Sequence, residues 1–278
     1  MNDLYLSYSG RKSYLDCPRQ YKHRYILHTN IKNIDKRDSL FGQMIGKVFE
    51  WFYSKQTWNT SKPIDATSDL IKPAIGYVLD HEKFNRSDDP ELISNIESEM
   101  IKLVPLGVKT IYNNNLLADS YSELKLDTNC INGDMKLRVG GRADFVHYHS
   151  RENFWILDGK GSKYRDKYVD PDQLIYYSVL HFLKHNVAPS RIGFIYWRFP
   201  DDPIDWVDYN EQSIRDNLNK TFDVAKRIKA NLFDTKPSSN CRICDYKSEC
   251  SEGETYLSEH KIQNCKKIEE SIFDLDYM

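Results

Sequence analysis

The chain has 278 residues, 40% hydrophobic and 13% aromatic, which is enough for one large packed domain or a core with an appended one. Its formal net charge of −2 does not indicate a nucleic-acid partner, although a local basic path and an acidic metal centre would cancel in this sum. No apolar run approaches the roughly 20 residues of a membrane helix, and the N-terminus lacks the regions of a signal peptide. We therefore expect a soluble, cytoplasmic protein with no membrane partner.

The first predicted element is a helix capped by Ser9 and restarted at Pro18, where a missing N–H is tolerated in the first turn. Residues 11–24 mix basic and aromatic side chains, and such a surface suits a nucleic-acid strand through phosphate contacts and base stacking. The alternative is a solvated helix whose tyrosines pack inward. The side chains concerned are Arg11, Lys12, Tyr14, Arg19, Tyr21, Lys22, Arg24 and Tyr25.

The middle of the chain changes from helical to strand patterns. Apolar residues have helical spacing over 39–55, and two or three helices are predicted over 65–113, with Pro73, Pro90 and Pro105 as interruptions or starts. Strands, helices and a turn at 132–134 follow, and their alternation favours an α/β core. The predicted strands are 121–128, 136–147, 154–160 and 191–199, and the predicted helices are 171–185 and 211–231.

The predicted organisation has four parts. These are an N-terminal helix with the first cysteine at 1–38, a helical region at 39–117, an α/β core at 118–235, and a cysteine-rich segment with an acidic tail at 236–278.

The clearest catalytic signal is Gly141-Arg142-Ala143-Asp144, followed by Asp158-Gly159-Lys160. Because side chains alternate along a strand, Asp158 and Lys160 project from one face, and Asp144 on a neighbouring strand would complete a divalent-cation site. Bound Mg²⁺ would activate water and neutralise phosphodiester charge, while Lys160 orients the water or stabilises the transition state. The alternative is an edge strand with a surface Asp–Lys pair.

Gln173 and Tyr177 lie one turn apart in the predicted helix that follows, so they share a face on which they can contact nucleic acid. The run Asp170-Pro171-Asp172-Gln173 also fits an N-cap, a first-turn proline and a capping-box glutamine. Gln173 is therefore predicted to cap the helix, to contact nucleic acid, or to do both.

The cysteines form a second constellation. Cys241, Cys244 and Cys250 have C-x2-C-x5-C spacing and need a fourth ligand, for which Cys17 is the natural candidate because of its polar, basic surroundings. Four thiolates suit zinc or an iron–sulfur cluster, and spacing alone does not separate them. A metal joining residue 17 to residue 241 would act as a staple, and we favour this structural role over redox chemistry. Two cysteines are interpreted as ordinary thiols, Cys130 and Cys265.

Taken together and in this order, the motifs resemble the RecB-like PD-(D/E)xK nucleases with an iron–sulfur staple. That group includes the AddB-type recombination nucleases and the CRISPR-associated adaptation nucleases. The resemblance runs from Ser7 to Cys250. Its matching segments are Ser7-x-Ser9, Cys17-Pro18-Arg19-Gln20-Tyr21, Gly141-Arg142-Ala143-Asp144, Asp158-Gly159-Lys160, Gln173-x3-Tyr177 and Cys241-x2-Cys244-x5-Cys250.

The resemblance implies an α/β, restriction-endonuclease-like PD-(D/E)xK core with a helical insert and a C-terminal iron–sulfur segment. It implies a [4Fe-4S] cluster rather than zinc, and Mg²⁺- or Mn²⁺-dependent hydrolysis of DNA that leaves a 5′-phosphate, with an exonuclease as the expected form. The expected role is DNA recombination, repair or processing. The expected partners are DNA, single-stranded or with single-stranded ends, and a helicase or a recombination or adaptation protein.

One departure concerns a metal-binding histidine that the family usually has on an early helix. Gly46 occupies its place here, so either Glu50, one turn on, supplies a ligand or the site works with fewer protein ligands. Glu123 is a second acidic candidate, or a surface strand residue. The main alternative function is a catalytically weak or inactive DNA-binding or scaffold protein on the same fold. A zinc-stabilised interaction protein is a third reading.

Overall fold

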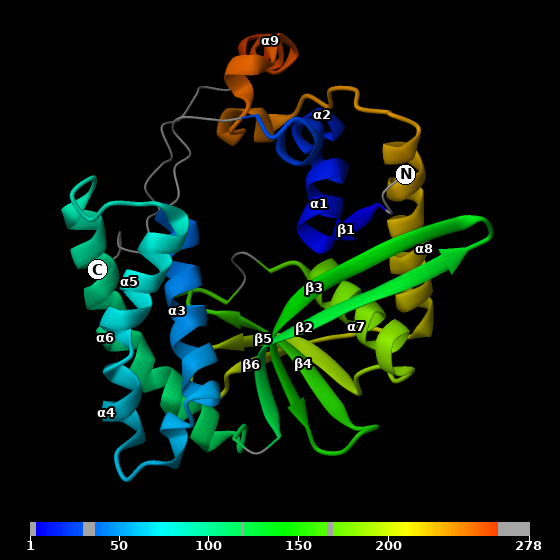
Figure 1. Ribbon diagram of the computed structural model, residues 1–278. Coiled ribbons are helices and arrows are strands. Elements are labelled where there is room, and N and C mark those ends of the chain that lie inside the picture. Colours follow the sequence, from blue (N-terminus) through cyan, green and yellow to red (C-terminus); the bar gives the residue numbers. More distant parts are fainter. Residues whose placement is uncertain (1–3, 30–36, 118, 166–168, 261–278) are drawn as a thin grey trace.

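The computed structural model describes residues 4–29, 37–117, 119–165 and 169–260. A central sheet is flanked by a layer of helices on each side (Figure 1). Its strands are β1 (Tyr5–Ser7), β2 (Ser120–Asn132), β3 (Met135–Tyr148), β4 (Phe154–Lys160), β5 (Arg191–Tyr196) and β6 (Ile204–Val207). The α-helices are α1 (Tyr8–Asp16), α2 (Pro18–Tyr21), α3 (Arg37–Ser54), α4 (Pro63–Ser68), α5 (Ile71–Glu82), α6 (Pro90–Asn113), α7 (Pro171–His185), α8 (Glu211–Lys229) and α9 (Ser251–Glu259).

The sheet is mixed, and its strands follow the order β1-β3-β4-β5-β6, with β2 paired to β3. The pairs β1–β3 and β4–β5 are parallel, and the other pairs are antiparallel. The predicted α/β class is confirmed. The short strands β1 and β6 were not predicted, because three or four residues carry too little periodicity to stand out.

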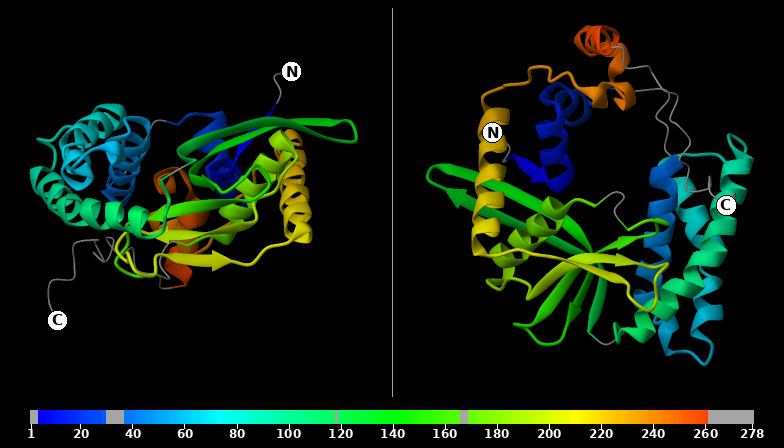
Figure 2. Two further views of the ribbon diagram at one scale, coloured as in Figure 1. Left: turned by 90° about the horizontal axis from the view of Figure 1, so that it is seen from below. Right: turned by 180° about the vertical axis from the view of Figure 1, so that it is seen from behind.

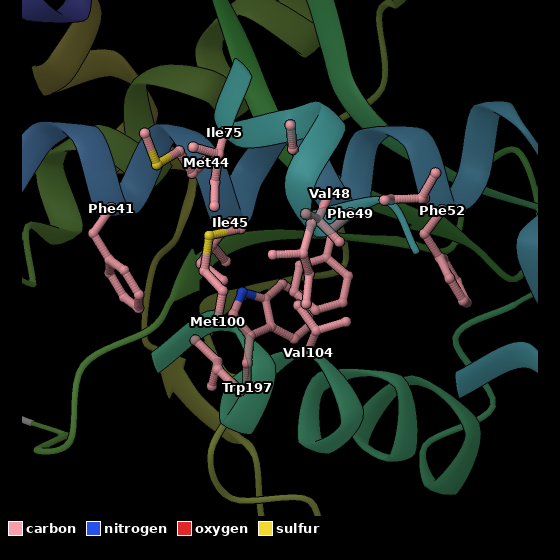
Figure 3. Close-up of a cluster of buried hydrophobic side chains, with 14 of the residues drawn as sticks. Phe41, Met44, Ile45, Val48, Phe49, Phe52, Ile75, Met100, Val104 and Trp197 are labelled. Atoms are coloured by element: carbon pink, nitrogen blue, oxygen red, sulfur yellow. The ribbon is translucent and has the colours of Figure 1, made fainter. Parts of the chain in front are cut away.

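Helices α3, α5 and α6 build the core on one face of the sheet. Figure 3 shows Phe49 and Val104 around the ring of Trp197, which follows β5. The rings of Phe49 and Trp197 stack with centroids 4.4 Å apart. A Cβ at Gly107 would overlap the Phe49 ring, so α6 approaches α3 closely only because residue 107 has no side chain. The helical layer is therefore packed directly on the strands.

Helices α1, α7 and α8 form the other layer, and a buried arginine joins them. Arg11 has no exposed surface; its guanidinium donates to Asn217 Oδ1 and Thr221 Oγ1 on α8 and forms an ion pair with Asp172 on α7, each at 2.7 Å. Tyr14 and Tyr21 are buried as well. The prediction of a nucleic-acid surface is therefore wrong for these three side chains. The inward packing of the two tyrosines matches the alternative, whereas the burial of Arg11 was not predicted.

Local predictions at the helix ends had mixed outcomes. Pro18 lies in the first turn of α2, as expected. The cap of α1 is Ser7, whose Oγ accepts from the Gly10 N–H at 3.1 Å, and not Ser9 as predicted. Pro105 lies inside α6 and does not interrupt it, although it removes one backbone hydrogen bond. Across the described ranges, no helix combines the length and apolar character needed to cross a membrane.

The N-terminal helices and the C-terminal segment lie side by side at one end of the molecule (Figure 1). The ion pair between Arg24 and Asp245, at 2.7 Å, joins them. Residues 261–278, which include Cys265 and most of the predicted acidic tail, lie outside the described residues.

Candidate functional site

Three carboxylates form a row across neighbouring strands. In the antiparallel register of β2 with β3, Glu123 occupies the position opposite Asp144. In the antiparallel register of β3 with β4, Phe145 pairs with Leu157. One position further along the pair, Asp144 lies beside Asp158. Pairing of the strands therefore brings together three acidic residues that are far apart in the sequence.

The strands change face at this row. Ala143 packs in the core with α7, whereas Phe145 packs in the core with α3, although residues two apart on a regular strand share a face. Opposite Asp144, Glu123 has a φ of 56°, in the left-handed region that non-glycine residues rarely adopt. Such a conformation costs about 1–3 kcal/mol and is often found at functional sites. The irregular part of the β2–β3 pair thus lies at Glu123 and Asp144.

Lys160 contacts the third carboxylate of the row. Its Nζ lies 2.6 Å from Asp158 Oδ2, as expected for two side chains on one strand face. The orientation does not complete a hydrogen bond, so this buried oxygen has an ion-pair neighbour but no hydrogen-bond partner. The neighbouring Asp144 Oδ2 accepts the Gly159 N–H at 3.1 Å. Asp158 Oδ2 is therefore a buried carboxylate oxygen that is paired with Lys160 and has further capacity to accept a cation.

The electrostatics of the row favour a cation. Burial raises the pKa of Asp144 well above its usual range, the negative charges of Asp158 and Glu123 raise it further, and the Gly159 N–H opposes them. Burial also raises the pKa of Asp158, against the opposing effect of Lys160. The pKa of Glu123 is raised by burial and then by the charge of Glu50. Carboxylate oxygens in such a group are the donors that Mg²⁺ and Mn²⁺ prefer, so the residues fit a divalent ion.

A cavity of about 380 Å³ opens beside the row, between α3, α5 and the strands. Asp144, Glu123 and Glu50 line it, whereas Asp158 and Lys160, both in the described part of the chain, do not. Gly46, where the resemblance expects a histidine, lies next to Glu123: a Cβ there would be 3.9 Å from Glu123 Oε1. Glu50 forms an ion pair with Lys47 on the same helix. The cavity therefore holds two glutamates where a histidine was expected.

Gln173 and Tyr177 lie on one face of α7, and Gln173 Nε2 donates to the Tyr177 hydroxyl at 3.1 Å. Burial raises the pKa of Tyr177, and the negative charge of Asp144 adds to this effect. Asp170 is the N-cap of α7, but its carboxylate accepts from Lys12 at 3.0 Å and makes no capping hydrogen bond. The predicted capping box is therefore wrong, and the Gln173 side chain is oriented by Tyr177.

Four thiols line one small cavity at the other end of the molecule: Cys17, Cys241, Cys244 and Cys250. Cys17 stands between α1 and α2, and the others lie on the short helical turns Ser239–Ile243 and Lys247–Glu249 or at their ends. The Ser238 N–H donates to Cys241 Sγ at 3.4 Å. A Cβ at Gly253 would be 3.4 Å from Cys241 Sγ and 3.5 Å from Cys250 Sγ, in ordinary contact. The donor set fits a thiolate-bound cluster or metal.

Cys130 is separate from this group. It is buried in β2, its thiol donates to the Leu137 carbonyl at 3.6 Å, and burial raises its pKa to about 11. This environment keeps the thiol protonated, as for an ordinary core cysteine. Within the described ranges, no three His, Cys, Asp or Glu side chains are already arranged to hold a metal ion.

Two functional neighbours were missed in the sequence. Arg198 donates to the Gly161 carbonyl at 2.8 Å and pairs with Glu99 of α6 at 2.9 Å, so it fixes the chain just after Lys160. No local pattern links residues so far apart. Arg142 lines the cavity with its guanidinium 4.0 Å from Glu123. Its place inside the Gly141–Asp144 motif was the only available signal.

Comparison with known proteins identifies the family of the chain. Residues 5–251 match the PD-(D/E)XK nuclease superfamily, so the chain belongs to that superfamily, whose members are generally nucleases. A solved structure described as the crystal structure of SSO0001 is similar over 90% of this chain and 88% of that chain, with 12% sequence identity and a TM-score of 0.39. No curated protein matches.

The raised pKa of Asp144 gives a stability prediction for the metal-free protein. An aspartate in the unfolded chain has a pKa of about 3.9, which is lower than the raised pKa of Asp144 in the folded chain. Ionisation of Asp144 is therefore easier in the unfolded chain, and the folded chain loses stability as the pH rises between these two pKa values. Asp144→Asn should therefore melt at least about 2 °C higher than the wild type at pH 8, the shift given by about 1 kcal/mol. The difference should vanish as the pH falls towards about 4.

Differential scanning fluorimetry in EDTA measures this shift. Asp223→Asn, at a largely exposed side chain of α8, is the control and should not change the melting temperature. Added Mn²⁺ should stabilise the wild type more than Asp144→Asn, because binding to the folded chain raises its stability. A lower melting temperature for Asp144→Asn at pH 8 would contradict the prediction.

Proposed function

We propose that this chain is a Mg²⁺- or Mn²⁺-dependent deoxyribonuclease that hydrolyses phosphodiester bonds, with exonuclease activity, in DNA recombination, repair or processing. The observation that carries the proposal is the row of Glu123, Asp144 and Asp158 beside Lys160, in which Asp158 is buried and the other two are partly buried. DNA that is single-stranded or has single-stranded ends is the proposed substrate. A helicase or a recombination or adaptation protein as partner, and a cytoplasmic location, stay predictions.

The proposed roles follow from the contacts. Asp144 and Asp158 hold the ion, the latter through the Oδ2 atom that has no hydrogen-bond partner. When bound, the ion would activate water and neutralise charge on the phosphodiester. The Lys160 ammonium, held by Asp158, orients the attacking water and stabilises developing negative charge. The water oxygen bonds to phosphorus, the bond from phosphorus to the 3′ oxygen breaks, and a 5′-phosphate remains.

Four further residues complete the proposed site. Glu123 and Glu50 add carboxylates from the cavity side, and the small residue 46 leaves space for them. Gln173 and Tyr177 position the nucleic acid; their mutual hydrogen bond and the closeness of Tyr177 to Asp144 support this role.

For the cysteines we propose a structural [4Fe-4S] cluster bound by Cys17, Cys241, Cys244 and Cys250. Their shared cavity and the Ser238 N–H directed at Cys241 Sγ support it, because N–H donors commonly surround cluster sulfurs. The cluster would join α1 and α2 to the C-terminal segment.

A catalytically inactive DNA-binding or scaffold protein is the second candidate. The observation that favours it is Gly46, which contributes no ligand where the family has a histidine. The two candidates differ in DNA cleavage and not in DNA binding.

Lys160→Ala should lower DNA cleavage by at least about 10²-fold, the usual effect of removing one group that stabilises developing charge. Protein purified without oxygen is incubated with end-labelled single- and double-stranded DNA and Mn²⁺. Lys226→Ala, on the exposed face of α8, is the control and should cleave like the wild type. Undiminished cleavage by Lys160→Ala would reject the site. A wild type that binds but does not cleave would favour the scaffold candidate.

Glu50→Gln should raise the Mn²⁺ concentration needed for half-maximal cleavage several-fold, because it removes one carboxylate from the ion's surroundings while keeping the shape of the side chain. DNA binding in EDTA should change little. Glu91→Gln, exposed in the first turn of α6, is the matched control. If the Mn²⁺ titration of Glu50→Gln equals that of the wild type, Glu50 has no role in metal binding.

Cys17→Ala should lose iron and visible absorbance after anaerobic purification, because three thiolates remain where four are needed. Cys130→Ala should retain both, since Cys130 lies in the sheet core. A colourless wild type containing zinc would reject the cluster. Full iron content in Cys17→Ala together with its loss in Cys265→Ala would mean that the fourth ligand was wrongly assigned.

A further inference from the structure

The strands β2 and β3 extend beyond the rest of the sheet as a long two-stranded ribbon (Figure 2). In β3, Leu137 and Val139 are buried, whereas Arg138 and Arg142 are exposed, so alternate residues divide between an inner and an outer face. Eight positions of the outer face carry four cations and one carboxylate. They are Lys125, Asp127, Asn129, Ile131, Lys136, Arg138, Gly140 and Arg142.

The cations of this outer face are arranged along the ribbon. Lys125 lies opposite Arg142 in the register, and Asp127 lies opposite Gly140. The Asp127 carboxylate is 3.0 Å from Lys125 Nζ and 3.9 Å from the Arg138 guanidinium, so it holds both cationic groups near the middle of the ribbon. A Cβ at Gly140 would overlap Asp127 Oδ1. The missing side chain at residue 140 therefore lets the carboxylate lie flat against the strand.

An aromatic ring lies among these cations. Tyr5 on β1 is the register partner of Arg138, and the Arg138 guanidinium carbon is 5.5 Å from the Tyr5 ring centroid. Tyr5 is 45% exposed, so part of its ring can contact a ligand. Together with Lys125, Asp127, Gly141 and Arg142 these two residues line a groove of about 360 Å³. Cations for phosphates beside a ring for bases are the usual components of a single-strand binding surface.

The groove continues into the candidate active site. Arg142 lines both the groove and the cavity that contains Asp144. The six steps from Arg138 to Asp144 span about 20 Å of strand, so the cations form a line that leads to the carboxylate row. Near the N-terminus, by contrast, the buried Arg11 is not accessible to a strand.

We propose that the outer face of the β2–β3 ribbon, with Tyr5, binds one strand of nucleic acid and guides it to the carboxylate row. The proposal rests on the proposed nuclease function, since it takes the row as the point of cleavage. An acidic protein segment would also be attracted to the cations. The exposed ring and the continuity with the cavity favour the polynucleotide.

The test compares two double variants with the same change in charge. Lys125→Glu/Arg138→Glu reverses two ribbon cations, and Arg215→Glu/Lys226→Glu reverses two cations exposed on α8. Fluorescence anisotropy with a labelled single-stranded oligonucleotide of about 16 nucleotides, in EDTA, measures binding without cleavage. The ribbon variant should bind at least about tenfold more weakly. Its plot of log affinity against log salt should flatten by about 1.4, for two lost phosphate contacts at about 0.7 each. The α8 variant should bind like the wild type.

Two single variants should change the affinity for the oligonucleotide in opposite directions. Asp127→Asn should tighten binding, because it removes the carboxylate that competes with phosphates for Lys125 and Arg138. Tyr5→Leu should weaken binding without changing the salt dependence, because stacking involves no counterion release. Unchanged affinity in the ribbon double variant, or equal weakening in the α8 variant, would overturn the proposal. Tighter binding of polyglutamate than of the oligonucleotide, lost in the ribbon variant, would also overturn it in favour of an acidic protein partner.

Cleavage of a mononucleotide substrate separates the two proposals. The p-nitrophenyl ester of thymidine 5′-phosphate is too short to reach the ribbon, so the Lys125→Glu/Arg138→Glu variant should hydrolyse it at the wild-type rate with Mn²⁺. The same variant should cleave the oligonucleotide more slowly than the wild type. If the wild type cleaves neither substrate, the nuclease function fails, whereas the binding measurements still decide whether the ribbon binds a strand.

Discussion

Like charges in a buried place oppose one another's ionisation, and the row of Glu123, Asp144 and Asp158 is subject to this constraint. Each carboxylate has a raised pKa, with burial as the first cause. Lys160 and the Gly159 N–H partly offset this repulsion, because each stabilises the negative charge of an aspartate in the row. A divalent ion would compensate more fully, because it carries two positive charges and accepts several oxygens. The fold brings the carboxylates together, and the cavity beside Glu123 and Asp144 leaves space for such an ion.

The helical layer fixes the strand that carries two of the candidate residues. Trp197 packs between Phe49 of α3 and the backbone of Gly159, where a Cβ would be 3.0 Å from the indole (Figure 3). Arg198 then ties the next loop to Glu99 of α6. Because these contacts flank Lys160, displacement of α3 or α6 would move the Asp158–Lys160 pair. The region predicted as a helical insert therefore supports the candidate site directly.

The N-terminal helices connect the candidate site with the cysteine cavity. Arg11 joins α1 to α7 and α8, and Arg24 joins the end of the next helical segment to Asp245. Between these two contacts Cys17 faces the C-terminal cysteines. Removing the Arg11 side chain would take a hydrogen-bond donor from the buried Asn217 and Thr221, which is unfavourable. The same layer holds Lys12 against Asp170 at the start of α7, close to Gln173.

The sequence alone determined what depends on neighbours along the chain. Strand alternation placed Asp158 and Lys160 on one face, helical spacing paired Gln173 with Tyr177, and cysteine spacing grouped the C-terminal thiols. Only the tertiary structure decided that Arg11 is buried, that β3 changes face beside Asp144 and that Glu123 has a positive φ. These features depend on strand register and on packing between residues far apart in the sequence. Local periodicity contains no information about either, so the basic N-terminal helix was open to two interpretations until its environment was known.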